Sequence, residues 1–178
     1  MRLSFLVIVP FVVVLGLAGC GTGTAEDKDA PPPIQPLGSS IKVEGKASSW
    51  SSSSDSYEGT ITALSPVAVF ANSTGEQVLV FDVEAKATKG AIPTGSWEVQ
   101  TENAVPVNNL PITKEGIAMP PLGPKVTDFA KGYVTFEVPS KSKPTVLQLV
   151  DVAPGTVGGS GQPIAQWSLG ELPAPRPR

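Results

Sequence analysis

An alternation of apolar and polar residues between Gln77 and Thr88 constrains the fold of this chain more than any other feature of its sequence. One side of the stretch carries Leu79, Phe81, Val83, Ala85 and Ala87. The other side carries Val80, Asp82, Glu84, Lys86 and Thr88. A repeat of two residues is the side-chain period of an extended strand with one buried face. The pattern therefore predicts a strand with an apolar inner face and a charged outer face.

The same period returns between Gly132 and Val138, where Val134 and Phe136 are predicted to point inward and Tyr133, Thr135 and Glu137 outward. Further strands are predicted at 59–64, 67–71, 97–101, 145–152 and 164–169. Clusters of Pro, Gly, Asn and Ser separate them, and no segment shows a sustained helical period with caps. About seven strands in about 115 residues predict an all-β fold, an immunoglobulin-like antiparallel β-sandwich rather than a closed barrel.

Two absences exclude whole classes of chemistry. The chain of 178 residues contains no histidine and one cysteine. A Ser-His-Asp triad, a Cys-His pair, a histidine-based zinc site and an internal disulfide are therefore impossible within it. The net charge of −3 gives no electrostatic footprint for nucleic acid, and no basic run would hold the chain to anionic lipid by charge alone. We expect a protein that is not an enzyme.

The single cysteine closes a short hydrophobic run at the N-terminus. Residues 3–17 are almost wholly apolar, too few for a bilayer span of roughly 20 residues but typical of a signal-peptide core. The run ends in Leu17-Ala18-Gly19-Cys20, which resembles the lipobox of bacterial lipoproteins. The resemblance implies cleavage between Gly19 and Cys20, an S-diacylglycerol group on Cys20 and N-acylation of the new terminus. The alternative is an ordinary secretory signal or a short anchor helix, which would leave a free thiol in an exported protein.

Composition divides the chain into four parts. We expect a helical signal peptide at 1–19, a disordered, lipid-anchored tether rich in Pro and Ser at 20–56, the sandwich at 57–170 and a flexible Pro/Arg tail at 171–178. If residues 21–56 are disordered, these 36 residues would span roughly 30–35 Å. The serine tract at 48–56 is interpreted as a flexible polar loop, with O-glycosylation as the alternative.

The second half of the chain carries a recognisable arrangement of strands and turns. Residues 128–139 contain a Gly followed by a Val-x-Phe-x-Val strand, a Pro/Lys turn leads into 142–149, and a Trp strand closes the series at 166–169. Together with the strand at 78–83, this resembles the small immunoglobulin-like domain of lipoproteins from actinobacteria and other Gram-positive bacteria, and it is similar to secreted immunogenic antigens of mycobacteria. The resemblance implies a sandwich outside the cytoplasm, in a family that is mostly of unknown function.

No acidic pair is predicted to form a catalytic or metal site. Asp82 and Glu84 lie on one strand face, about 7 Å apart, and are expected to point to solvent. Glycoside hydrolysis needs two carboxylates that face each other across a cleft. Glu98 and Glu102 are interpreted in the same way, and the acidic stretch at 26–29 lies in the tether and contains a lysine. We therefore predict no catalytic residue, no cofactor and no metal ion.

Four aromatic residues decide whether the sandwich exposes a ligand patch. Trp97 and Trp167 are predicted to lie in the core. If either were exposed beside Tyr133, the surface would indicate a ligand or partner site, and Phe129 is the fourth aromatic in this region.

These inferences predict a lipoprotein on the extracytoplasmic face of the cell membrane, held through Cys20 by membrane lipid. The leading hypothesis is a non-catalytic binding or adhesion module for a protein or an envelope polymer. The first alternative is an accessory subunit of a transport or cell-wall assembly complex. A remote alternative is a carboxylate-based hydrolase of wall polymers.

Overall fold

A computed structural model describes residues 30–46, 56–71, 76–110, 120–152 and 161–175, with the backbone alone at 65–68. The chain divides into two compact units, Met1–Ala30 and Pro31–Arg178, and every described strand lies in the second. The eleven strands are β1 (Gln35–Pro36), β2 (Ser40–Lys46), β3 (Ser56–Ala71), β4 (Glu76–Lys89), β5 (Ile92–Pro93), β6 (Trp97–Thr101), β7 (Pro106–Asn108), β8 (Lys125–Val126), β9 (Phe129–Pro139), β10 (Pro144–Asp151) and β11 (Gln162–Ser168).

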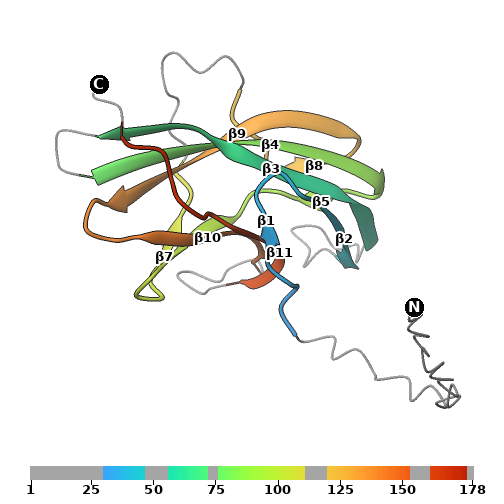
Figure 1. Ribbon diagram of the computed structural model, residues 1–178. Helices are drawn as coiled ribbons and strands as arrows, with labels where there is room; N and C mark the ends of the chain where they lie inside the picture. The colour runs from blue at the N-terminus through green and yellow to red at the C-terminus, as the bar shows by residue number, and fades with distance from the viewer. Residues whose placement is uncertain (1–29, 47–55, 72–75, 111–119, 153–160, 176–178) are drawn as a thin grey trace, which may run out of the picture. The chain divides into compact units, whose positions relative to one another are not determined.

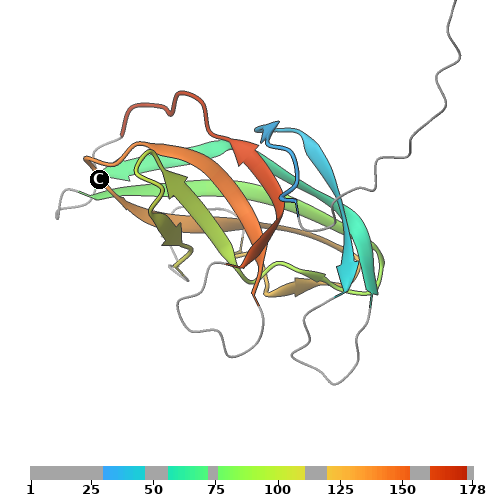
Figure 2. The same cartoon turned by 90° about the horizontal axis from the view of Figure 1, so that it is seen from below.

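The strands form two main layers (Figures 1 and 2). The five-stranded sheet has the order β1-β11-β10-β6-β7, and the four-stranded sheet has the order β2-β3-β4-β9. A small third sheet pairs β5 with β8. All pairs are antiparallel except β1 with β11.

The strand order is that of an immunoglobulin-like sandwich. In the five-stranded sheet, β6, β10 and β11 follow the C-F-G order of immunoglobulin domains, and in the other sheet β9, β4 and β3 follow the order E-B-A. Strand β2 is added at the edge beyond β3, and the described residues form no strand at the position of D. The predicted fold class, an all-β immunoglobulin-like antiparallel sandwich, is confirmed.

The apolar residues that alternate between Gln77 and Thr88 form the inner face of β4. All five residues predicted to point inward are buried, and Leu79, Phe81 and Val83 have no exposed surface. They pack against the inner faces of β9 and of the five-stranded sheet in one core cluster. Phe81 meets Phe136 of β9 edge to face, with ring centroids 5.9 Å apart. The apolar face that the sequence period predicts is therefore the one on which the two main layers pack against each other.

The predicted boundary between tether and sandwich at residue 57 is wrong. Residues 35–36 and 40–46 are strands β1 and β2, and Val43 is 2% exposed. The indole Nε1 of Trp167 donates a hydrogen bond to the carbonyl oxygen of Ser39 (2.9 Å). The composition of this stretch is that of a linker, and its apolar alternation covers only Ile41 and Val43, so its strand character is weak in the sequence. The serine tract up to residue 55 lies outside the described residues.

Two other predicted boundaries change. The predicted strands 59–64 and 67–71 are one continuous strand, β3, whose register against β4 shifts on either side of Pro66. Proline lacks the N–H that a sheet ladder uses, which explains both the break in the pattern and the bulge. The predicted tail begins with an ordered stretch, because Leu172 is half-buried and packs against the core.

The outer face of β9 is more covered than its sequence predicts. Tyr133 and Thr135 were expected to face solvent, yet they are 3% and 1% exposed. Isolated bridges join Leu110 to Thr135 and Pro121 to Tyr133, so the chain crosses this face at two points. The backbone of Leu122 passes so close to Gly132 that a Cβ there would lie 2.7 Å from its Cα. The glycine before the Val-x-Phe-x-Val strand thus permits this crossing.

Candidate functional site

Cys20, the predicted lipidation site, lies outside the described residues, and so does Gly19 on the other side of the expected cleavage point. The first described contact of the chain with the sandwich is at Pro32, whose carbonyl oxygen accepts a hydrogen bond from Nε2 of Gln166 (2.7 Å). Strand β1 then runs parallel to β11, with Gln35 beside Trp167. The chain therefore reaches the sandwich from the side on which β11 begins. The described residues contain no helix long and apolar enough to cross a membrane.

The aromatic residues do not form an exposed patch. Trp97 and Trp167 have no exposed surface, which confirms their predicted place in the core. Each indole Nε1 has a backbone acceptor: Thr94 for Trp97, and Ser39 for Trp167. Tyr133 is buried, and Phe129 is 54% exposed at the start of β9. An exposed tryptophan beside Tyr133, the predicted sign of a ligand site, is not observed.

The acidic side chains of β4 lie on its outer face, as their spacing predicts. Glu84 makes an ion pair with Lys131 of β9 (2.5 Å). Asp82 is only partly exposed, and its Oδ1 is buried without a hydrogen-bond partner among the described residues. This burial raises the pKa of the Asp82 carboxyl above its ordinary value. In the part of the chain that the structure describes, no three acidic or cysteine side chains come together as metal ligands.

Glu98 differs from its predicted solvent-facing position. It is 3% exposed on the outer face of the five-stranded sheet and accepts a hydrogen bond from Nε2 of Gln148 (2.9 Å). Register places Gln148 directly opposite both Glu98 and Gln166, so three polar side chains form a row across β6, β10 and β11. Gln148 bonds to Glu98 within the row, Gln166 donates instead to the carbonyl oxygen of Pro32, and all three side chains are buried, which fits a structural role. Sequence reasoning missed it because cross-strand register is not visible in a single strand.

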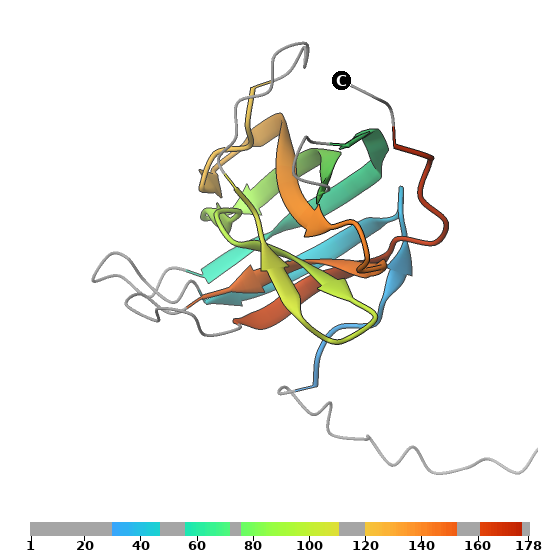
Figure 3. The same cartoon turned by 90° about the vertical axis from the view of Figure 1, so that its left-hand side faces the viewer.

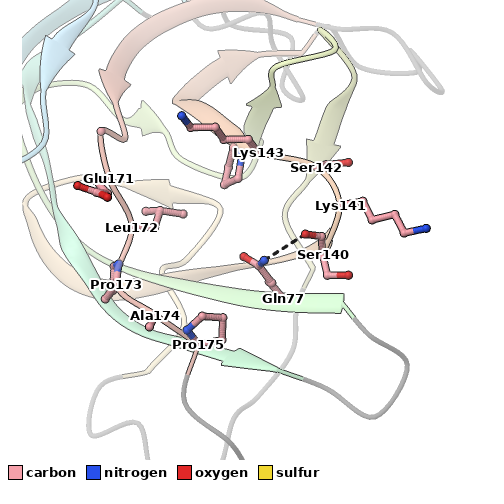
Figure 4. Close-up of a pocket in the computed structure, with 12 residues that line it drawn as sticks. Gln77, Ser140, Lys141, Ser142, Lys143, Glu171, Leu172, Pro173, Ala174 and Pro175 are labelled. Carbon is pink, nitrogen blue, oxygen red and sulfur yellow. Dashed lines mark hydrogen bonds between the residues drawn. The ribbon is translucent and has the colours of Figure 1, made fainter.

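The end of the sandwich where β9 turns into β10 faces the viewer in Figure 3. A groove opens there (Figure 4), and we call this end of the sandwich the groove end. Its volume is about 380 Å³, and Gln77 of β4 lies between its two walls. One wall is the turn Ser140–Lys143, and the other is the segment Gly170–Pro175. Nε2 of Gln77 donates to the carbonyl oxygen of Ser140 (3.4 Å), which ties the turn to β4.

The groove mixes polar and apolar groups. Lys141 and Lys143 are exposed on one wall, where no ion pair with a described residue holds them. Glu171 lies on the other wall beside Leu172, which packs against the core. Such a surface can hydrogen-bond and pack against an extended chain. Among its described lining residues Glu171 is the one carboxylate, whereas glycoside hydrolysis uses two that face each other.

Comparisons with known proteins add little to this description. No family model and no curated protein matches the sequence. Among solved structures, the fold is similar to MPT63, a secreted protein from Mycobacterium tuberculosis, with 13% sequence identity and a TM-score of 0.49. The similarity covers 78% of this chain and 98% of the MPT63 chain.

Proposed function

We propose that this protein is a lipoprotein of the cell envelope, anchored by lipid on Cys20, that displays its sandwich as a non-catalytic binding module on the extracytoplasmic face of the membrane. The observation that carries the proposal is Leu17-Ala18-Gly19-Cys20 at the end of a signal-like apolar run, in a chain with no other cysteine. Two or three acyl chains hold a protein to a membrane far more firmly than one.

The binding part of the proposal is supported by the shape and chemistry of the sandwich. The groove between Ser140–Lys143 and Gly170–Pro175 has a volume of about 380 Å³. It offers lysine ammonium groups and serine hydroxyls on one wall and apolar side chains, Leu172 and Pro173 among them, on the other. The chain cannot build histidine or cysteine chemistry in the mature domain, because it has no histidine and its one cysteine is assigned to the anchor. A protein or an envelope polymer is the proposed occupant.

Replacement of the anchor residue tests the proposal. In Cys20→Ala, the precursor should keep its N-terminal segment, because neither lipid transfer nor the cleavage that follows it can occur. The variant Ser4→Ala, in the apolar run, is the matched control and should be processed normally. A Cys20→Ala chain cut to the same mature end as the wild type would overturn the anchor.

Pull-down of the wild-type protein from detergent-solubilised membranes tests its role as a binding module. An interaction lost in Lys143→Glu but kept in Lys86→Glu would support the groove as the binding surface. A stoichiometric membrane-protein partner kept by both variants would favour an accessory subunit instead.

A further inference from the structure

The fold brings lysines that are scattered in the sequence to the end of the sandwich opposite the groove. At this lysine end β2 and β4 finish, while β3 and β9 begin. Among the residues that the structure describes, six exposed lysines lie there: Lys42, Lys46, Lys86, Lys89, Lys125 and Lys131. Five carboxylates accompany them: Glu44, Glu58, Glu84, Asp128 and Asp151.

The groove end has the opposite balance. Its described residues carry two lysines, Lys141 and Lys143, against four carboxylates: Glu76, Glu102, Glu137 and Glu171. The net charge of the described residues is therefore positive at the lysine end and negative at the groove end, although the whole chain is acidic. Such an asymmetry orients a protein in an electric field, including the field of a charged surface.

Three lysines of the lysine end have no ion-pair partner in the described part of the chain. Ion pairs hold Lys42 to Glu44 (3.0 Å), Lys89 to Glu58 (3.7 Å) and Lys131 to Glu84 (2.5 Å). Lys46, Lys86 and Lys125 make no ion pair with any residue that the structure describes. As far as the described residues go, no carboxylate competes with a phosphate group from outside the molecule for these ammonium groups.

An exposed aromatic ring lies among these lysines. Phe129 is 54% exposed and stands directly opposite Lys86 in the pairing of β4 with β9. Nζ of Lys131 lies 5.7 Å from the centre of the Phe129 ring. Lysine keeps its charged head in the polar layer while its stem follows apolar surface, so a phenylalanine flanked by lysines suits the boundary between headgroups and acyl chains.

The length of the N-terminal segment keeps the folded unit within reach of a membrane. The ten residues from Gly21 to Ala30 separate Cys20 from the folded unit and span at most about 35 Å when fully extended. The chain enters along β1 from the side on which β11 begins, which is the lysine end. An anchored domain of this kind samples the membrane surface at high effective concentration, so a weak attraction is enough to orient it.

We infer that the lysine end, centred on Phe129, Lys86 and Lys125, rests on the anionic headgroups of the membrane and turns the groove outward. This inference depends on the proposed lipid anchor. It names phospholipid phosphate as the second partner of the domain.

The mature lipoprotein in vesicles provides the test. Its only native cysteine is acylated, so a new cysteine can be labelled alone with a fluorophore: Thr60→Cys at the lysine end, or Ser140→Cys at the groove end. Quenching by spin-labelled lipid is measured in phosphatidylcholine vesicles with and without phosphatidylglycerol. With phosphatidylglycerol, the label at 60 should be quenched at least about twofold more than the label at 140. The difference should disappear in 1 M salt, where the Debye length is about 3 Å.

Variants separate this inference from the anchor itself. Lys86→Glu with Lys125→Glu should abolish the difference in quenching, while Lys141→Glu with Lys143→Glu should preserve it. Equal quenching of the two labels on vesicle-bound wild-type protein would overturn the orientation and leave the anchor intact. Failure of the lipoprotein to float with vesicles of either composition would overturn the anchor and, with it, this inference.

Discussion

Trp97 and Trp167 are stacked in the centre of the sandwich, with ring centroids 5.9 Å apart and ring planes inclined by 24°. In immunoglobulin domains the tryptophan of strand C packs against a disulfide between the sheets. Here β6 occupies the place of strand C, and a chain with one cysteine cannot form an internal disulfide. The second indole fills the space next to Trp97 instead.

Loss of this pair should destabilise the protein strongly. Trp167→Ala should lower the free energy of unfolding by about 3–5 kcal/mol, because it leaves a large cavity and removes the hydrogen bond to Ser39. Phe129→Ala is the matched control, since this ring is exposed and its loss should change stability by no more than about 0.5 kcal/mol. Urea unfolding followed by circular dichroism measures both, and equal effects would contradict the role of the stack.

Replacement of Gly132 should disturb the place where the backbone of Leu122 crosses β9. A Cβ at this position lies 2.7 Å from both N and Cα of Leu122, so Gly132→Ala should cost about 1–3 kcal/mol of stability. At Gly123 the nearest atom is 3.9 Å away, and Gly123→Ala should stay within about 0.5 kcal/mol of the wild type. Thermal unfolding of the two variants side by side makes the comparison. Equal stability of both would show that the crossing tolerates a side chain.

Asp82 should cost the protein stability at neutral pH. Burial raises its folded-state pKa, so its favourable contribution is complete below the ordinary value of 3.8 and is lost as the pH rises through the folded-state pKa. Asp82→Asn removes the ionised form and should raise the free energy of unfolding at pH 7 by about 1 kcal/mol. The difference in the free energy of unfolding between Asp82→Asn and the wild type should shrink as the pH falls toward 3.8. A variant less stable than the wild type at pH 7 would contradict this account.

Tyr57 should make the sandwich sensitive to alkali. Burial, assisted by the negative charge of Asp151, raises the pKa of its phenol from 10.0 to about 12. The contribution of the neutral phenol to stability is therefore complete below pH 10 and is lost as the pH rises toward 12. Tyr57→Phe should lose less stability over this range than the wild type does. Parallel unfolding titrations check this, and identical pH dependence in the two proteins would count against it.

The layers of the fold could be predicted from strands whose alternation is long enough to read. Strand β6 lies within its predicted bounds, and β4 and β9 extend their predictions by a few residues. Short edge strands such as β1, β2 and β7 carry too few apolar residues to show a period, and their pairing depends on neighbours far away in the chain. Val80 was expected to face solvent with the charged side chains of β4, but it has no exposed surface. The pattern of a single strand does not show that other segments of the chain cover its outer face.

The candidate sites also differ in how far the sequence predicts them. The anchor motif at Leu17–Cys20 is contiguous, so the sequence alone predicts it. The groove and the lysine end are assembled from separate strands and turns, and only the register of the sheets brings their residues together.

Mass spectrometry of the N-terminal peptide, taken from protein purified out of the membrane fraction, tests the central claim most directly. We predict a peptide that begins at Cys20 and carries a diacylglyceryl thioether, with its terminal amine acylated or free. A peptide that contains an unmodified Cys20 thiol, or that begins at another residue, would contradict the lipid anchor.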